Sequence, residues 1–327
     1  MKNNKNFIKV SMLILLETII LMALFSFIPQ DVLAGIGSPS ITTITEFEVE
    51  NSFPEIQNIT INGGTAITLI PNSTKTVECI GIIIDYNGDT DIKTANATFF
   101  DSSISQTDPD DNNDHYTNPS CEINRTFGSY AGINDDAYKA LASCTFEIEY
   151  YANPGLWNCS MQVNDSVNNK GTGAEEEVIS ELLALGLPAT INYGTVNATY
   201  VSDENITNIT NYGNVEINLS LEGYGASQGD GSAMNCTFGS VGNISIEYEK
   251  YNLTASTPGV LSLSETEATH TNLTTTPEIK QFNLGPRMDD TTNDAIKESY
   301  WRIYVPKGVA GTCTGNIIFG ATTAAGS

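Results

Sequence analysis

The sequence has 327 residues, and 14 lysines and arginines against 39 aspartates and glutamates give it a net charge of −25. Because domains commonly hold about 100–150 residues, this length predicts two domains once an N-terminal segment is set aside. Hydrophobic residues make up 40% of the chain, enough for packed cores, which excludes disorder throughout. The acidic charge excludes duplex nucleic acid as a partner, because binding to phosphates requires lysine and arginine.

The first 34 residues have the pattern of an export signal. Three lysines within the first nine residues precede a mostly apolar stretch over residues 10–28, and small residues around Ala34 suit a signal peptidase. We therefore predict a signal peptide over 1–34, with a retained transmembrane anchor over 10–28 as the alternative. Glu17 disfavours the anchor, because an acidic side chain in mid-bilayer costs about 3 kcal/mol. Either reading places the remaining chain outside the cell, with membrane contact only through an uncleaved N-terminal segment.

All six cysteines follow this segment, at Cys79, Cys121, Cys144, Cys159, Cys236 and Cys313. An even number without a C-x-x-C pair, in an exported chain, predicts three disulfides rather than a zinc site. Cys236 and Cys313 are the only two in the C-terminal half and are expected to pair. Six cysteines allow 15 pairings, so the first half stays open; there we favour Cys79–Cys159 and Cys121–Cys144.

Asn-x-Ser/Thr sequons are unusually frequent in the exported part. They occur at Asn58, Asn72, Asn96, Asn124, Asn158, Asn164, Asn197, Asn205, Asn208, Asn218, Asn235, Asn243, Asn252 and Asn272. This number exceeds what the asparagine, serine and threonine content gives by chance. We predict that some of them carry N-linked glycans, in a cell that performs this modification.

Alternating apolar and polar residues predict an all-β protein. Residues 156–165 alternate along their length, as do residues 144–150 just before them and residues 215–222 in the second half. We therefore expect two Ig-like β-sandwich domains in tandem, over 40–170 and 188–325.

The segment between them, residues 171–187, is expected to be a linker. Three glutamates, Glu175 to Glu177, precede Val178, Leu182 and Leu185, which are spaced as on one face of a helix. A short helix is one prediction for this segment. An extended connector whose leucines pack on one domain is the other.

The stretch Asn153-Pro-Gly155-Leu-Trp157-Asn-Cys159 resembles the Asp-x-Gly-x-Tyr-x-Cys signature of immunoglobulin-like domains. The resemblance implies that Trp157 forms the corner of strand F and that Cys79, on strand B, is the partner of Cys159 across the sandwich. Two departures separate the chain from antibody domains. No tryptophan follows Cys79 on the next strand, and the long separation of the two cysteines implies an acidic insertion, which we place at 101–136.

More broadly, the chain is similar to uncharacterised, secreted, sequon-rich β-sandwich proteins of archaeal cell surfaces. The similarity rests on short structural motifs: Cys79…Asp85-Tyr-Asn-Gly88, Trp157-Asn-Cys159…Val163-Asn-Asp165, Asn211-Tyr-Gly-Asn214 and Tyr300-Trp-Arg-Ile-Tyr-Val-Pro306. It implies a surface location and no catalytic activity.

An acidic loop is the strongest candidate for a metal site. Asp108, Asp110, Asn112 and Asp114 alternate as oxygen ligands do in a calcium loop, although Asn113 and Pro119 stand where an EF-hand requires Gly and Glu. A looser calcium site with Glu122 is one interpretation and a solvated loop is the other. The same spacing recurs in Asp85, Asn87, Asp89 and Asp91, where Asn87-Gly88 first indicates a hairpin turn. We expect no other cofactor.

Catalytic motifs are weak. A Ser-His-Asp arrangement would have to use His115, in the acidic loop, or His270, in a Thr-rich segment without a nucleophile motif. Tyr300, Arg302 and Tyr304 alternate along a strand and are expected to project outward together. We therefore predict no catalytic activity.

These observations favour a secreted or cell-surface, N-glycosylated structural or interaction protein of the cell envelope. Its expected partners are other envelope proteins or glycans. An adhesin-like binding module for glycan or protein, assisted by calcium, is the alternative, and a secreted hydrolase is a distant one.

Overall fold

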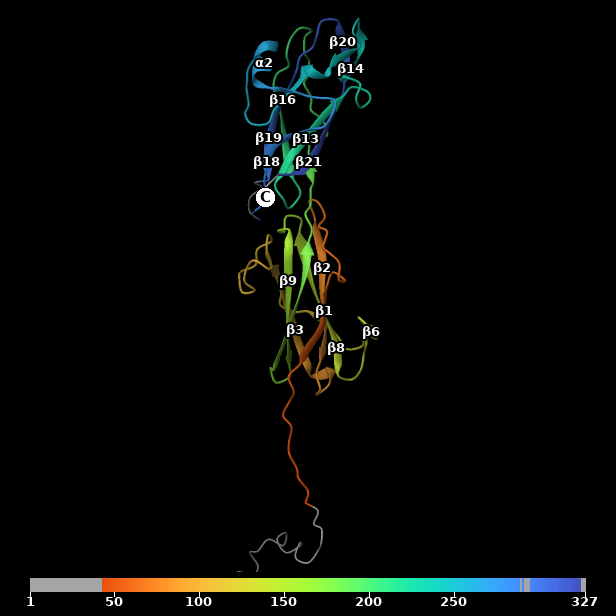
Figure 1. Ribbon diagram of the computed structural model, residues 1–327, viewed down its shortest axis with the longest axis vertical. Helices are drawn as coiled ribbons and strands as arrows, with labels where there is room; N and C mark the ends of the chain where they lie inside the picture. The colour runs from red at the N-terminus through yellow and green to blue at the C-terminus, as the bar shows by residue number, and fades with distance from the viewer. Residues whose placement is uncertain (1–42, 289, 291–294, 325–327) are drawn as a thin grey trace, which may run out of the picture. The chain divides into compact units, whose positions relative to one another are not determined.

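The computed structural model describes residues 43–288, 290 and 295–324. The elements described below all belong to one compact unit, Asn51–Ser327 (Figure 1). The expected signal peptide or anchor at 1–34 lies outside the described residues. Among the described residues, no helix is both long and apolar enough to cross a membrane.

The first sandwich consists of two four-stranded sheets. One has the order β1-β2-β8-β5, formed by β1 (Glu55–Ile61), β2 (Thr74–Ile84), β8 (Lys139–Glu149) and β5 (Glu122–Asn124). The other has the order β10-β9-β3-β4, formed by β10 (Lys170–Ile179), β9 (Gly155–Asp165), β3 (Ile92–Asp101) and β4 (His115–Asn118). These two orders match the A-B-E-D and G-F-C-C′ sheets of an immunoglobulin-like domain, so the expected fold class is confirmed.

Alternation along β8 and β9 positions the core between these sheets. On β9, Trp157, Cys159 and the following odd-numbered residues are buried while their neighbours are partly exposed. The disulfide Cys79–Cys159 joins β2 to β9 across the sandwich. Phe99 on β3, the register partner of Cys159, packs 4.9 Å from Trp157 between ring centroids. Antibody domains carry a core tryptophan on the strand that follows the first cysteine. In this protein Phe99 supplies the aromatic ring on that strand.

The predicted disulfide pairs are confirmed. Cys121–Cys144 lies within one sheet, beside the pairing of β5 with β8, and Cys144 is also the register partner of Cys79. The two disulfides of the first sandwich therefore meet at one level of its core. Cys236–Cys313 joins two paired strands of the second sandwich.

The helix predicted for 171–187 is wrong. Residues 170–179 form β10, which pairs with β9 along its whole length. The three glutamates and Val178 thus belong to a strand of the first sandwich. Helical spacing of a few apolar residues was overridden because the edge of β9 offered a complete ladder of backbone hydrogen bonds.

The segment 101–136 is not simply an acidic insertion. It contains β4 and β5, which are two of the eight strands of the sandwich. It also contains a small hairpin of β6 (Ser129–Tyr130) and β7 (Ile133–Asn134). Short, polar edge strands lack a clear alternation of apolar residues, which is why the sequence favoured a loop.

The second sandwich has one five-stranded sheet and two three-stranded sheets. The first has the order β11-β12-β19-β16-β17, with β11 (Leu185–Gly186), β12 (Asn205–Asn211), β19 (Ile296–Ile303), β16 (Glu249–Asn252) and β17 (Thr271–Asn272). The second consists of β18 (Glu278–Leu284), β13 (Ile217–Tyr224) and β21 (Asn316–Thr323). The third consists of β15 (Asn243–Ser245), β14 (Ser232–Gly239) and β20 (Val309–Thr314).

The core of the second sandwich forms around Trp301 on β19. It packs against Tyr251 of the neighbouring strand β16 and Phe319 of the facing strand β21, at centroid distances of 5.4 and 5.5 Å. Its indole N–H donates to Ser299 Oγ, so the buried polar atom is satisfied. The short helix α2 (Leu263–Thr269) lies in the connection between β16 and β17, and Ser262 and Glu265 form a capping box at its start.

Candidate functional site

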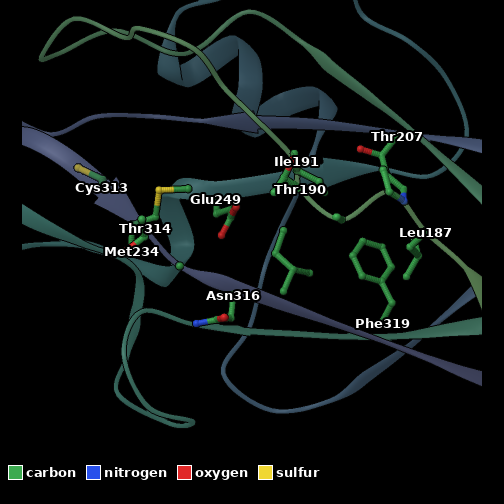
Figure 2. Close-up of a pocket in the computed structure, with 14 residues that line it drawn as sticks. Leu187, Thr190, Ile191, Thr207, Met234, Glu249, Cys313, Thr314, Asn316 and Phe319 are labelled. Carbon is green, nitrogen blue, oxygen red and sulfur yellow. The ribbon is translucent and has the colours of Figure 1, made fainter.

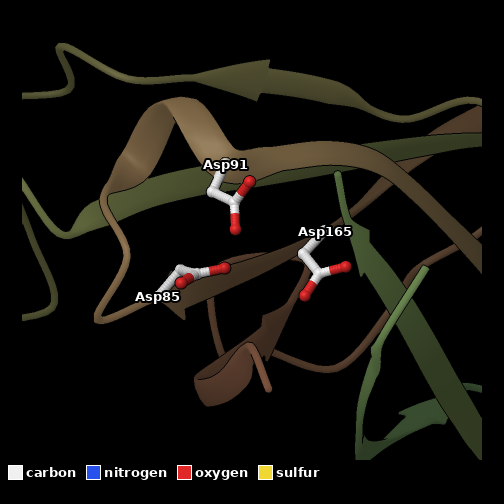
Figure 3. A group of neighbouring side chains, drawn as sticks. All are labelled: Asp85, Asp91 and Asp165. Atoms are coloured by element: carbon white, nitrogen blue, oxygen red, sulfur yellow. The ribbon is translucent and has the colours of Figure 1, made fainter. Parts of the chain in front are cut away.

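Three aspartates of the first sandwich converge on one point. Asp85 follows the last residue of β2, Asp91 ends the short 3-10 helix η2 (Asp89–Asp91), and Asp165 is the last residue of β9. Each contributes a carboxylate oxygen to a group whose atoms all lie within 4.8 Å of one another. Figure 3 shows the three side chains pointing toward a common centre.

Local turns hold two of these carboxylates in place. Asp85 Oδ1 accepts a hydrogen bond of 2.9 Å from the backbone N–H of Asn87, as expected for an Asx turn. Asp165 Oδ1 accepts from the backbone N–H groups of Val167 and Asn169, at 2.9 and 2.7 Å. Each side chain therefore uses one oxygen to shape its own turn. The second oxygen of each remains for other partners.

Three carboxylates held this close together, without a counter-ion, lower the stability of the fold. The Asp85 side chain is fully buried, and its Oδ2 has no hydrogen-bond partner. Burial, together with the nearby carboxylates of Asp91 and Asp165, raises the pKa of Asp85, while a backbone hydrogen bond opposes the shift. Hydrogen bonds from Ser166 and Asn51 lower the pKa of Asp91. A buried acceptor without a donor beside two further carboxylates calls for a compensating positive charge.

Sequence reasoning found two of these three aspartates. Asp85 and Asp91 belong to the spacing Asp85, Asn87, Asp89, Asp91, which was considered for a cation. Asp165 comes 74 residues after Asp91, at the end of β9, which belongs to the sheet opposite to β2. Its sequence signals were its position at the end of the alternating segment that forms β9 and its place in the motif Val163-Asn-Asp165, and neither indicated a cation site.

The loop predicted to bind calcium has its side chains directed to several different partners. Asp108 accepts from the backbone of Ser105. Asp110 contacts the ring of His115 at 2.9 Å, and Asn112 donates to Asp290. Among the described residues, the structure brings Asp85, Asp91 and Asp165 together and does not bring Asp108, Asp110, Asn112 and Asp114 into such a group. Calcium binding by this loop stays a prediction.

The ring nitrogens of both histidines lie close to oxygen atoms of other residues. The ring nitrogens of His115 contact Asp110 and the carbonyl of Gln106. His270 is buried, with Nδ1 2.8 Å from Oγ1 of Thr269 and Nε2 3.9 Å from Glu204. Burial lowers the pKa of His270.

The expectation that Arg302 projects outward with its neighbours is wrong. Its side chain is fully buried and donates to the backbone carbonyls of Ser202, Thr257 and Gly259. The loops that contain these residues cover the outer face of β19. Alternation on a strand cannot reveal such a cover, because it reports only which residues share a face.

A pocket of about 380 Å³ lies in the second sandwich beside β16 and β21 (Figure 2). Apolar side chains such as Ile191 and Phe319 line it together with Thr207 and one acidic residue, Glu249. Glu249 is 2% exposed; its Oε1 accepts from the hydroxyl of Tyr193, and its Oε2 has no partner. Burial raises the pKa of Glu249 to about 7, against the opposing effect of this hydrogen bond. No sequence pattern marked this residue.

The 14 sequon asparagines all lie at the surface to some degree. Eight are exposed and six are partly exposed, which leaves none of them buried. Some have an occupied amide nitrogen, the atom that would carry a glycan: Asn205 Nδ2 donates to the carbonyl of Asn192, and Asn252 Nδ2 donates to that of Thr269.

Comparisons with known proteins identify no family. No family profile matches the sequence, and no curated protein is similar to it. A solved chain from a chaperone–tip adhesin complex of CFA/I fimbriae is 12% identical, with 84% of this chain and 85% of that chain covered and a TM-score of 0.28. The C-terminal domain of the Streptococcus agalactiae AgI/II polypeptide BspA is 10% identical, with a TM-score of 0.21. The match covers 83% of this chain and 100% of that domain. Salmonella alpha-2-macroglobulin is 11% identical, with a TM-score of 0.23. The match covers 85% of this chain and 15% of that chain. Likeness at this level carries no functional argument.

Proposed function

We propose that the protein is an extracellular, N-glycosylated structural and interaction component of a cell envelope, without catalytic activity. The observation that carries this proposal is the use of cysteine. Each of the six forms a disulfide that joins strands of a sandwich, and such bonds persist in oxidising compartments outside the cytosol. The surface positions of the sequons are compatible with this location.

The architecture supports a structural rather than a catalytic role. Each described sandwich buries its own aromatic core, and the strands are cross-linked by disulfides. The acidic surface and attached glycans would keep such a protein hydrated and attractive to divalent cations. The partners that fit this chemistry are glycans and other envelope proteins, bound at a surface outside the cores.

The pocket beside Glu249 favours a second candidate, an adhesin-like binding module. A half-apolar pocket with one buried, unpartnered carboxylate oxygen suits a ligand with an apolar body and a hydrogen-bond donor or cationic group. A glycan array and a pull-down from envelope extract, each performed with the wild type and with Glu249→Gln, test this candidate. A ligand retained equally by both forms would place binding elsewhere on the protein.

Peptide mass spectrometry of the protein from fractionated cells that produce it tests the main proposal. We expect recovery in the envelope or secreted fraction, three intact disulfides and glycans on exposed sequons such as Asn72 and Asn197. We expect lower occupancy at Asn205 and Asn252, because modification there requires loss of a hydrogen bond. Recovery from the cytosol with reduced cysteines would contradict the proposal.

A further inference from the structure

We propose that Asp85, Asp91 and Asp165, together with Asn51, form a calcium site. This site would fix the chain segment that begins at Asn51 to the end of the first sandwich at which β2 and β9 terminate. This proposal does not depend on the proposed function, because it concerns a metal site in the folded chain wherever the protein acts.

The spacing of the ligands fits calcium. Ca²⁺ binds oxygen at about 2.3–2.6 Å, so two ligands on opposite sides of the ion lie about 5 Å apart. The carboxylate oxygens of the three aspartates lie within 4.8 Å of one another, so a calcium ion fits among them. Mg²⁺ needs ligand pairs no more than about 4.2 Å apart and near-octahedral geometry, which suits this irregular set of loops less well.

The side chains of the two buried aspartates, Asp85 and Asp165, are already oriented for binding a cation. Oδ1 of Asp85 and Oδ1 of Asp165 accept backbone hydrogen bonds within their own turns, which fixes the side-chain orientation before any ion binds. A preorganised carboxylate loses little conformational entropy on binding.

A second observation points to a ligand independently of this clustering. Asp85 has no exposed surface, and its Oδ2 has no donor within hydrogen-bond distance, because the nearby hydroxyl of Ser52 donates to Oδ1 of Asn87. Lys93 lies on the rim of the depression over this site, but its ammonium group donates to the carbonyl of Thr90. A metal ion would satisfy the orphaned oxygen and reduce the repulsion among the three carboxylates.

Asn51 links the chain entering the sandwich to this cluster. Its Nδ2 donates to Oδ2 of Asp91 at 2.9 Å and to Oδ2 of Asp165 at 3.1 Å, while its Oδ1 is buried without a partner. Rotation of the amide by about 180° exchanges these two atoms and turns an oxygen toward the carboxylates. Asn51 would then supply a fourth oxygen ligand, with water completing the shell.

The residues that follow Asn51 also contact the first sandwich. Asn87 Oδ1 accepts hydrogen bonds from the backbone N–H and the hydroxyl of Ser52. Pro54 packs so closely on β10 that a Cβ at Gly171 would lie 2.2 Å from its carbonyl oxygen. Calcium would therefore hold the segment from Asn51 to Pro54 against β2, β9 and β10.

Metal titration of the full exported chain tests the proposal. Extracellular calcium modules commonly bind with dissociation constants of about 0.1–1 mM, so isothermal titration and thermal melts would cover about 0.05–10 mM CaCl₂ after chelator treatment. We expect saturable binding of one ion and a rise in Tm of roughly 5 °C for the first sandwich at saturation. MgCl₂ should give a clearly smaller shift.

Two variants and two controls make the test specific. Asp91→Asn should weaken calcium binding at least about tenfold, whereas Asp89→Asn in the same 3-10 helix and Asp108→Asn in the acidic loop should not. Asp85→Asn should raise the Tm in chelator, because it removes the unpaired buried charge, and should abolish the calcium-dependent rise. A misfolded variant would have a lower Tm in chelator. A higher Tm in chelator together with a lost calcium response therefore indicates loss of the site rather than misfolding.

The proposal is overturned by any of three results. These are a wild-type Tm that calcium leaves unchanged at 10 mM, equal loss of binding in Asp89→Asn and Asp91→Asn, or a Mg²⁺ shift equal to that with Ca²⁺.

Discussion

The indole N–H of Trp157 donates a hydrogen bond of 2.8 Å to the backbone carbonyl of Asn153, four residues earlier in the chain. In immunoglobulin-like domains a tyrosine hydroxyl at this corner bonds back to the backbone in the same way. Trp157 thus anchors the turn into β9 while its rings fill the core beside the Cys79–Cys159 disulfide.

Trp157→Phe should destabilise the first sandwich by about 2 kcal/mol or more. The substitution leaves the partly buried carbonyl of Asn153 without its donor and removes packed volume. Urea unfolding measures the change. Leu156→Ala, at the adjacent and 44% exposed position, is the control and should alter stability by less than about 0.5 kcal/mol. Equal effects of the two substitutions would contradict the role of the corner.

Loss of the disulfides should follow the lengths of the loops they close. The Cys79–Cys159 bond spans 80 residues and Cys121–Cys144 spans 23. Chain-entropy arguments give about 4.5 and about 3.4 kcal/mol for loops of these lengths. Paired Cys→Ala variants compared by chemical denaturation should show the larger loss for Cys79–Cys159, because both disulfides lie in the same core and the loop lengths are what distinguish them. The reverse order would mean that the cross-sandwich link contributes little.

The pH dependence of stability should reveal Glu249. Its pKa is raised to about 7 in the folded state from a usual value of 4.5, so its contribution is fully present below pH 4.5 and is lost as the pH rises through 7. The loss amounts to as much as about 3 kcal/mol. Glu249→Gln should remove this slope between pH 5 and 8, as measured by denaturation at each pH, while the exposed Glu247→Gln keeps it. Parallel wild-type and Glu249→Gln profiles would show that Glu249 does not titrate there.

Asp230 should have the opposite effect at low pH. Its carboxylate accepts backbone hydrogen bonds from Gly225, Ala226, Ser227 and Ser232, which lower its pKa to about 2. It therefore stabilises the loop between β13 and β14 above about pH 4, and this contribution is lost as the pH falls toward 2. Asp230→Asn should lower the Tm at pH 6 and flatten the profile between pH 2 and 5. A variant as stable as the wild type at pH 6 would contradict this role.

Local patterns in the sequence predicted the strands with clear alternation and favoured the cysteine pairs that the structure contains. The alternation around Trp157 and Cys159 fixed which side of β9 faces the core, because side chains on a strand alternate with a period of two. An even number of cysteines in an exported chain predicted disulfides, and the resemblance of residues 153–159 to an immunoglobulin-like signature implied the corner. Each of these signals is contained within one short stretch of chain.

Only the tertiary structure decided what lies beside a strand edge or over a face. The glutamates at 175–177 became a strand because β9 was available to pair with them, and Arg302 became buried because loops cover β19. Asp165 joined Asp85 and Asp91 because β2 and β9 end on the same side of the sandwich. Convergence of side chains distant in sequence depends on how the sheets pack. The acidic composition predicted that nucleic acid is not a partner, but only the fold placed three of the carboxylates around a common centre.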